Sequence, residues 1–439
     1  MSTRTQMIQL RRVAHRITTK SGSPEAIYVG LENIESWTGR YLRGGEDDGK
    51  GVADSAAGEG LATLFDEGDV LFGKLRPYLA KVWRATFSGR CTAEALVLRP
   101  TVKIDSRYLK WLLLEPRFVD EVDGSTYGSK MPRAEWDFIG RIEVPLPPLP
   151  EQQRIANLLD TKTAAIDRLL AKKERLLAVL AEERQALVTQ LVTKGLDPNA
   201  PMRASEVEWA ESLPSHWRAL PIKRLARPGH RTFTDGDWIE APYITDRGVR
   251  LLQTGNVGIG TFREQGGRFI SDETFAALRC TLLEAGDVMI CRLDGPVGRA
   301  CLAPSLGTRM VTSVDNAILK LDPEHDARFI VYALSSPRYL EWVQALVRVG
   351  GGFRYRVSRT MLGDFRVPVP PRDEQRAIAD HLDRGTHTLR EIEQGLLAAI
   401  ERLREYRRAT ITAGVTGTLT TGALESSAGV ANQLELALA

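Results

Sequence analysis

Apolar residues recur at heptad spacing along a stretch that contains neither proline nor glycine, Glu151 to Lys194. Steps of seven, four and three residues place these side chains on one face of a helix, as in a coiled coil. Gly195 and the following Asp197-Pro198 are typical of a helix stop. The sequence therefore predicts a helix about 66 Å long. Its apolar seam consists of Leu159, Ile166, Leu169, Leu176, Leu180 and Leu187.

A second stretch near the C-terminus repeats this pattern at a constant offset of 223 residues. It contains Gly395, which costs roughly 1 kcal/mol unless packing compensates. Two long helices with apolar stripes are expected to pair with each other. The predicted seam of the second helix consists of Leu382, Leu389, Ile392, Ala399, Leu403 and Thr410.

The same offset extends beyond the helices, so the chain is a tandem duplication. Residues 151–160 and 374–383 are identical at six of ten positions, and a proline-rich segment precedes each. Proline is not expected to continue a strand or to lie inside a helix. We therefore expect the segments 145–150 and 368–371 to end each domain before its long helix starts. The predicted order is domain, long helix, domain, long helix.

Within each domain, short apolar runs alternate with turn signals and short helical patterns. Two of the runs follow Gly-Asp turns, at Gly68 and at Gly286. Such runs, bounded by turn residues, predict buried strands. The predicted strands include 71–72 and 96–98 in the first domain and 288–290 and 317–319 in the second, and the predicted short helices are 107–114 and 327–334. The pattern indicates α+β domains.

Composition limits the class of protein. A chain of 439 residues is expected to form two to four domains, and 43% hydrophobic and 26% charged residues are typical of globular proteins. No apolar run approaches the length of a membrane span, and the N-terminus has no apolar core of a secretory signal. The four cysteines, Cys91, Cys280, Cys291 and Cys301, match neither a disulfide framework nor a zinc pattern. A reducing cytoplasm is the expected location.

Motifs for catalysis or cofactor binding are weak or missing. Residues Gly44 to Lys50 fit GxxxxGK, but Gly51 replaces the required Ser or Thr and three acidic residues lie within the motif, so an exposed turn is favoured. GxSxG and a helix-opening GxGxxG are absent, and the six histidines show no metal-binding spacing. Glu151 and Glu374 begin the long helices, where the helix dipole favours carboxylates for structural reasons. We expect no catalytic residue, no metal site and no cofactor.

Positive charge is small in total but locally concentrated. The net charge is +3, which decides little by itself. Basic, glycine-rich loops precede both proline-rich segments, and guanidinium and hydroxyl groups on such loops suit phosphates and guanine edges. Solvated loops are the alternative interpretation, which the recurrence in both domains weakens. The predicted DNA-binding residues are Lys74, Arg76, Tyr127, Ser129, Lys130 and Arg133 in the first domain, and Arg292, Arg348, Arg354, Tyr355, Arg356 and Arg359 in the second.

A duplicated domain, each copy ending in Pro-Pro-x-x-Glu-Gln before a long helix, resembles the specificity subunit of type I restriction-modification systems. The motif occurs as Pro147 to Gln152 and as Pro370 to Gln375. The linker Lys194 to Pro198 and the segment Leu213 to Trp217 are also similar to that family, although no Pro-x-His-Trp segment precedes the first domain. The resemblance extends over nearly the whole chain, to about residue 420.

This resemblance implies an α+β fold with two tandem target recognition domains, whose long helices pair as an antiparallel coiled coil. The expected boundaries are 1–149, 150–195, 196–371 and 372–420, followed by a mobile tail at 421–439. Each domain would recognise one half of a split site in double-stranded DNA, and the paired helices would set the distance between the two halves. The subunit would not be an enzyme itself. It would join two modification subunits, which carry the S-adenosylmethionine-dependent methyltransferase, and restriction subunits, with no membrane contact.

Two alternative functions stay open at this point. The chain would act as a self-sufficient DNA methyltransferase if its catalytic motif escaped recognition, although no Asp/Asn-Pro-Pro-aromatic motif occurs. It would act as a coiled-coil adaptor if the basic loops bind no DNA. Methyl transfer by the chain alone supports the first alternative. DNA retention that falls with salt argues against the second, because it reports phosphate contacts.

Overall fold

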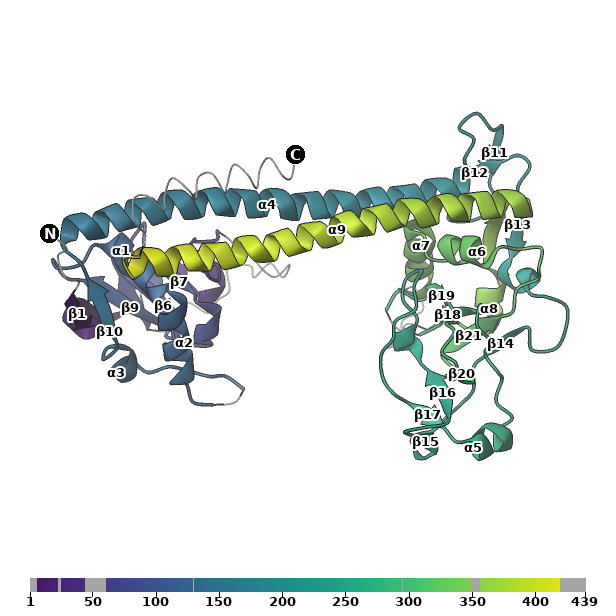
Figure 1. Cartoon of the computed structure of the whole chain (residues 1–439), viewed down its shortest axis with the longest axis horizontal. Coiled ribbons are helices and arrows are strands. Elements are labelled where there is room, and N and C mark those ends of the chain that lie inside the picture. The colour runs from purple at the N-terminus through teal and green to yellow at the C-terminus, as the bar shows by residue number, and fades with distance from the viewer. Residues whose placement is uncertain are drawn as a thin grey trace. The chain divides into compact units, whose positions relative to one another are not determined.

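The computed structural model describes residues 6–22, 25–43, 61–128, 130–293, 295–348 and 356–418. The chain divides into two compact units. Unit 1 consists of Met1–Glu174 and Leu397–Ala439, and unit 2 consists of Arg175–Leu396. Each unit therefore contains one strand-rich domain and a segment of both long helices (Figure 1).

The described residues of unit 1 form three small sheets. One has the strand order β2-β9-β6-β7 with antiparallel neighbours, another has the order β3-β5-β8-β4, and β1 pairs with β10. The described strands are β1 (Gln6–Gln9), β2 (Ala14–Ile17), β3 (Lys20–Ser21), β4 (Tyr28–Val29), β5 (Ala62–Phe65), β6 (Val70–Gly73), β7 (Val82–Arg84), β8 (Gly89–Cys91), β9 (Ala95–Pro100) and β10 (Glu143–Leu146).

Three short α-helices are described in the domain of unit 1. They are α1 (Ser106–Leu113), α2 (Pro116–Gly124) and α3 (Trp136–Ile139). Asp105 caps α1 by accepting hydrogen bonds from the backbone N–H groups of Arg107 and Tyr108, which satisfies two otherwise unpaired donors. The apolar face of α1 packs into the same core as β6 and β9, where Tyr108 and Leu109 are fully buried.

Unit 2 repeats the framework of unit 1 with altered details. The order β14-β21-β18-β19 corresponds to β2-β9-β6-β7, with the same antiparallel neighbours, and β13 pairs with β22 as β1 does with β10. The described strands are β11 (Met202–Ala204), β12 (Ser212–Pro214), β13 (Arg218–Pro221), β14 (Phe233–Asp235), β15 (Ile244–Thr245), β16 (Val249–Leu252), β17 (Phe269–Ile270), β18 (Val288–Cys291), β19 (Ala300–Leu302), β20 (Met310–Thr312), β21 (Asn316–Leu319) and β22 (Arg366–Val369).

In unit 2, β11 also pairs with β12, and β15, β17, β16 and β20 form a further sheet. This four-stranded sheet, compared with β3-β5-β8-β4 of unit 1, distinguishes the two domains. Both versions contain one parallel pair, β4 with β8 in unit 1 and β16 with β20 in unit 2. The strand orders differ, because β5 pairs with β8 whereas β17 pairs with β16. The short helices of unit 2 are α5 (Asp272–Ala277), α6 (Ala327–Ala333), α7 (Pro337–Arg348) and α8 (Arg359–Asp364). The domains therefore share a scaffold and differ in the part that this sheet carries.

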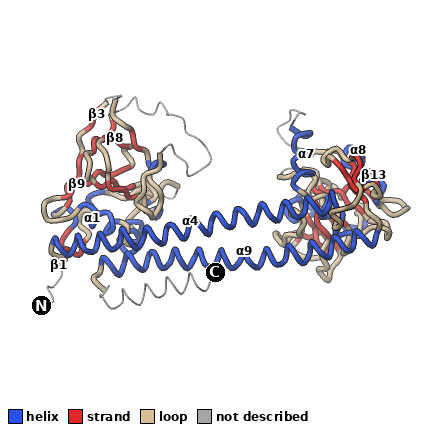
Figure 2. Tube along the Cα trace, turned by 90° about the horizontal axis from the view of Figure 1, so that it is seen from above, coloured by secondary structure: helices blue, strands red, loops and turns tan. Residues whose placement is uncertain are grey.

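The two long helices are α4 (Leu149–Lys194) and α9 (Arg372–Val415). They pack antiparallel within each unit, and Figure 2 shows them as the longest helical segments of the chain. In unit 1, Asp167 bonds Arg407 at 2.8 Å and Glu174 bonds Arg404 at 3.2 Å. Residues later in α4 therefore contact residues earlier in α9, as in an antiparallel pair. The predicted antiparallel pairing is confirmed.

In unit 2, the same antiparallel arrangement joins the end of α4 to the start of α9. Arg184 pairs with Glu393 at 3.9 Å, and Val192 packs in one core with Ile378. A Cβ on Gly385 would lie 3.0 Å from the side chain of Leu187, so this glycine permits a close helix approach. Gly195 stops α4 with φ of 73°, the left-handed conformation expected of a helix stop.

The predicted seam is right at some positions and wrong at others. Leu159, Ile166, Leu382 and Leu403 are buried, whereas Leu176 and Ile392 are exposed and Leu396 and Ile400 are buried instead. Heptad spacing alone does not decide which member of an adjacent leucine pair, such as 169–170 or 176–177, lies in the seam, because either member continues the repeat.

The Glu-Gln pair that begins each long helix has a structural role. Gln152 is fully buried, accepts the backbone N–H of Asp105 at 2.8 Å and donates to the carbonyl oxygens of Lys103 and Pro147. Gln375 repeats this arrangement, accepting the N–H of Asp326, the cap of α6, at 2.9 Å. Each glutamine thus fixes a domain's first main helix to the start of a long helix.

The two glutamates have different partners. Glu374 accepts hydrogen bonds from Trp217 Nε1 at 3.1 Å and pairs with His216 at 2.8 Å, whereas Glu151 pairs with Arg154. The structural interpretation of these carboxylates therefore fits their contacts. The His-Trp segment, which precedes only the second domain, thus provides both partners of Glu374.

The expectation that proline ends each domain was wrong in one respect. Pro145 lies inside β10 and Pro368 inside β22, opposite Met7 and Ala219 respectively. Each strand belongs to a two-stranded sheet, so one side of it is an edge, where the missing N–H of proline leaves no ladder position empty. Pro150 lies in the first turn of α4, which also tolerates proline.

Across the part of the chain that the structure describes, no helix combines the length and the apolar content needed to cross a bilayer.

Candidate nucleic-acid interface

Three predicted arginines of unit 2 lie together around two carboxylates. Arg292 pairs with Asp235 at 2.9 Å, Arg356 with Asp315 at 3.1 Å, and Arg359 lies 3.8 Å from Asp235. These five residues form what we call the arginine cluster. With three guanidinium groups and two carboxylates it has one surplus positive charge, which is the sign that a phosphate requires.

The members of the arginine cluster differ in exposure. Arg292 is only 4% exposed and donates to the carbonyl oxygens of Val314 and Val357. Burial, opposed by Asp235, lowers the pKa of its guanidinium. Its side chain therefore fastens the segments around 314 and 357 to β18, and Arg356 and Arg359 are the cluster's exposed cations.

Unit 1 contains the same ion pair at the equivalent place. Arg133 pairs with Glu94 at 3.0 Å, as Arg356 does with Asp315, and the sequence offsets are 223 and 221 residues. The backbone repeats as well: Arg133 forms a β-bridge with Leu75, and Arg356 forms one with Leu293. We call Arg133–Glu94 and Arg356–Asp315 the repeated ion pair. It fixes the loop before each proline-rich segment onto the neighbouring hairpin.

The other predicted residues of unit 1 surround this ion pair. The backbone N–H of Lys74 donates to the backbone carbonyl oxygen of Glu94, and that of Arg76 donates to the carbonyl oxygen of Pro132. Arg76 is exposed with φ of 51°, a left-handed conformation that is uncommon for a residue with a side chain. Tyr127 is exposed and its hydroxyl donates to Glu135 at 2.9 Å, which raises the pKa of that hydroxyl. Lys130 is exposed.

Several predicted positions lie outside the described residues. These are Ser129, Arg354 and Tyr355, and the same holds for the GxxxxGK segment 44–50 and for the tail from 419 onward. Arg348 ends α7, but its side chain is not described. The structure therefore brings together Arg292, Arg356 and Arg359 in unit 2, and Lys74, Arg76, Tyr127 and Arg133 in unit 1.

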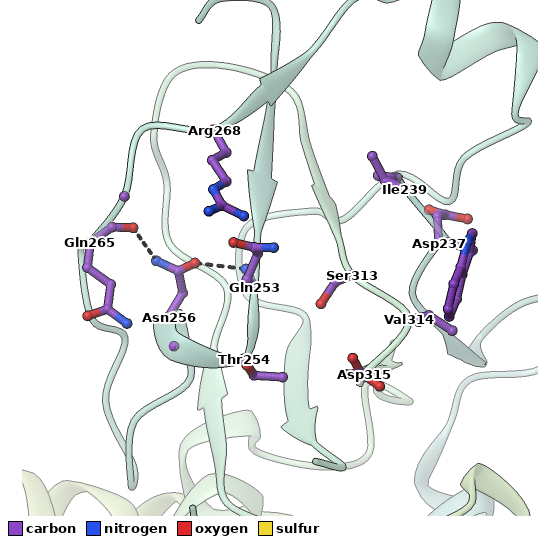
Figure 3. A pocket seen from close by; sticks show the side chains of 13 residues that line it. Asp237, Ile239, Gln253, Thr254, Asn256, Gln265, Arg268, Ser313, Val314 and Asp315 are labelled. Carbon is purple, nitrogen blue, oxygen red and sulfur yellow. Dashed lines mark hydrogen bonds between the residues drawn. The ribbon is translucent and has the colours of Figure 1, made fainter. Parts of the chain in front are cut away.

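Sequence reasoning missed a polar pocket next to the arginine cluster. Its volume is about 510 Å³, and Figure 3 shows the side chains of Gln253 and Arg268 directed into it. Asp315 belongs to the pocket wall and to the repeated ion pair, so the two sites share a border. Four separate segments form the wall, at 237–239, 253–256, 265–268 and 313–315. No local motif joins them, although Gln253 and Ser313 each follow an apolar run at a strand end.

The described side chains offer little for metal or thiol chemistry. Within them, no group of three or more His, Cys, Asp or Glu is placed to hold a metal ion. All four cysteines are described, and no disulfide joins them. Burial raises the pKa of Cys91 and Cys301 to about 12 and that of Cys280 to about 11, so these thiols stay protonated near neutral pH and are poor nucleophiles.

Sequence comparisons point to one family. The profile of the "Type I restriction modification DNA specificity domain" matches residues 41–178. The type I restriction enzyme EcoDI specificity subunit of Escherichia coli is 30% identical over 185 residues, which is 42% of this chain and 39% of that protein. The MjaVIII specificity subunit of Methanocaldococcus jannaschii is 22% identical, and 58% of each chain is aligned. The matched regions thus span about two fifths and three fifths of these two relatives.

A longer alignment and two solved structures agree. The EcoBI specificity subunit of Escherichia coli is 22% identical over 80% of this chain and 74% of its own. A chain from a study of assembly and conformational transition of the type I R-M system has a TM-score of 0.72, covering 94% of this chain and 98% of that chain at 18% identity. The HsdS subunit of Thermoanaerobacter tengcongensis has a TM-score of 0.51, with 94% and 97% covered, also at 18% identity. The chain is therefore similar to the specificity (S) subunits of type I restriction-modification systems, and its residues 41–178 match the specificity domain of that family.

Proposed function

We propose that this chain is the non-catalytic, sequence-reading subunit of a type I restriction-modification complex, and that each unit reads one half of a split DNA target. One observation carries the proposal: the repeated ion pair occurs on the same scaffold in both units, while the sheet orders around it differ. Two domains that recognise different DNA sequences are expected to share a scaffold and to differ in the segments around it. The two half-sites are therefore expected to differ.

Contacts of two kinds are expected at each half-site. The exposed arginines of the cluster, together with Arg76 and Lys130 in unit 1, suit phosphates, which give affinity and register without sequence information. Polar side chains on the neighbouring rims suit base edges, which give sequence preference. The predicted positions Ser129, Arg348, Arg354 and Tyr355 remain candidates for either kind of contact.

The long helices are proposed to set the gap between the half-sites. Each is continuous from one unit into the other, with 46 residues in α4 and 44 in α9. Proline is absent from α4 beyond its first turn and from the whole of α9. An uninterrupted helix is stiffer than a loop, so a fixed spacing is expected.

The partners proposed for the chain are two modification subunits, which would transfer the methyl group, and restriction subunits. The duplicated framework suits two identical partners, because a repeated surface offers two equivalent sites. The names of the relatives call those proteins specificity subunits of restriction enzymes, which supports this assignment by family. The boundaries 1–149, 150–195, 196–371 and 372–420 remain our proposal for the functional parts.

A methylation assay tests the proposal. The chain is purified alone and with its modification subunits, and each sample receives DNA and labelled S-adenosylmethionine. We expect transfer only by the complex, at a split sequence. Transfer by the chain alone would favour a self-sufficient methyltransferase. DNA binding by the complex that does not fall with rising salt would argue against phosphate contacts and for a coiled-coil adaptor.

A further inference from the structure

The polar pocket of unit 2 lies where two parallel strands end. Gln253 follows β16 and Ser313 follows β20, and these strands run parallel. Their carboxyl ends therefore meet at one edge of the sheet, and the residues after them line the same cavity of about 510 Å³ (Figure 3). A cavity of this size accommodates groups as large as a nucleobase edge.

The rim of this pocket is held firmly by Asn256. Its Oδ1 accepts the backbone N–H of Gln253 at 2.8 Å, and its Nδ2 donates to the carbonyl oxygens of Arg263 and Gln265, both at 2.9 Å. Asn256 is itself buried. One amide thus joins two of the four wall segments, 253–256 and 265–268, so the segments from which Gln253 and Arg268 project are held together before any ligand binds.

Gln253 and Arg268 have unused polar groups. Over the described ranges, neither side chain makes a hydrogen bond or an ion pair, and Figure 3 shows both head groups facing the cavity. The indole of Trp238 forms another part of the wall and is 67% exposed. A fixed rim that presents an unpaired amide, an unpaired guanidinium and an exposed aromatic ring is suited to contact another molecule.

The charges of the pocket favour base edges over phosphate. The pocket wall contains one guanidinium, that of Arg268, and two carboxylates, those of Asp237 and Asp315, and Asp315 is already paired with Arg356. A phosphate site would need surplus positive charge, which the neighbouring arginine cluster has and the pocket lacks. Mixed donors and acceptors are what base edges require: a glutamine amide matches adenine and a guanidinium matches guanine in the major groove.

We propose that this pocket contacts base edges of one half-site, with Gln253 and Arg268 as the residues that decide which base pairs are accepted there. The inference rests on the proposed function. The arginine cluster beside the pocket would hold the phosphates of the same segment, because Asp315 belongs to both sites. Base contacts and phosphate contacts would then alternate along a single strip of unit 2.

The test is DNA selection by the assembled complex with its modification subunits. Complexes with the wild-type chain, Gln253→Ala, Arg268→Ala and the control Arg263→Ala bind a random-sequence duplex library, and the retained DNA is sequenced. Arg263 lies in the same β16–β17 connection but outside the pocket wall. We expect discrimination to fall roughly 5- to 150-fold at one or two positions of a single half-site in the two pocket variants. The control should keep the wild-type preference.

Wild-type preferences at every position in both pocket variants would overturn the inference. Gln253→Glu covers the case in which the alanine variants lose all binding. Its carboxylate only accepts hydrogen bonds, so preference should move toward a cytosine N4 donor at the affected position. An unchanged preference, or loss of binding by a folded complex, would count against the pocket. If the wild-type complex selects no split sequence at all, the proposed function fails instead.

Discussion

The loop before each proline-rich segment is tied down by one arginine and one carboxylate, in both units. A partly exposed pair of this kind contributes at most about 1 kcal/mol to stability, so its repetition is better explained by position than by folding energy. It fixes where the loop's other side chains project. The charge was predictable from the sequence, but burial was not: Arg292 looks like Arg356 in the sequence, yet it lies in the interior.

Arg133→Ala and Arg356→Ala form a matched pair of variants. Each should weaken selection of its own half-site by roughly tenfold, which corresponds to about 1.4 kcal/mol, and leave the other half-site unchanged. Arg338→Ala removes a more exposed ion pair, that of Arg338 on α7 with Glu211, and serves as the control. Library selection by the complex measures all three. Equal losses at both half-sites would contradict the separation of the two readers.

The buried glutamines are the residues on which the attachment of each domain most depends. Gln152→Ala leaves the N–H of Asp105 and two carbonyl oxygens without their partner. Each buried group left unpaired costs about 1–3 kcal/mol, so the free energy of unfolding should fall by at least about 2 kcal/mol in urea. Gln153→Ala changes an exposed neighbour and should have almost no effect. Similar losses in both variants would show that the buried hydrogen bonds matter little.

At the level of elements, the long helices, the buried strands and the repeat were predictable, because each depends on local spacing. Three features were not. The middle of the helix seam was ambiguous between adjacent leucines, Pro145 and Pro368 lie within edge strands, and the pocket of unit 2 draws its wall from four separate segments. Pairing partners and side-chain directions of this kind depend on tertiary contacts.

Two glycines of α9 separate helix propensity from helix packing. A Cβ on Gly395 meets nothing within 4 Å, so Gly395→Ala should raise stability by about 1 kcal/mol. A Cβ on Gly414 would lie 2.9 Å from the side chain of Leu159, which would have to move. Gly414→Ala should therefore gain clearly less, or lose. Urea unfolding of both variants measures this, and equal gains would contradict the close packing of α4 and α9 in unit 1.

At the level of the whole molecule, the two DNA-recognition domains lie on continuous helices, so the length of the helices is expected to determine the spacing between the half-sites. Deleting seven residues, Glu174 to Leu180, keeps the heptad phase and shortens α4 by about 10 Å. A matching deletion of residues 395–401 keeps α9 in step. At about 3.4 Å per base pair, the preferred gap should shrink by about three base pairs. An unchanged gap between the half-sites, with methylation retained, would argue that the helices do not set this gap.

The most direct measurement of the central claim uses a DNA library in which the two half-sites are separated by every gap from none to about one helical turn, ~10 base pairs. The wild-type complex methylates this library and the products are sequenced. A single preferred gap, with sequence preference on both sides and none within it, is the predicted result. Methylation of one contiguous sequence, or equal methylation at all gaps, would contradict the account.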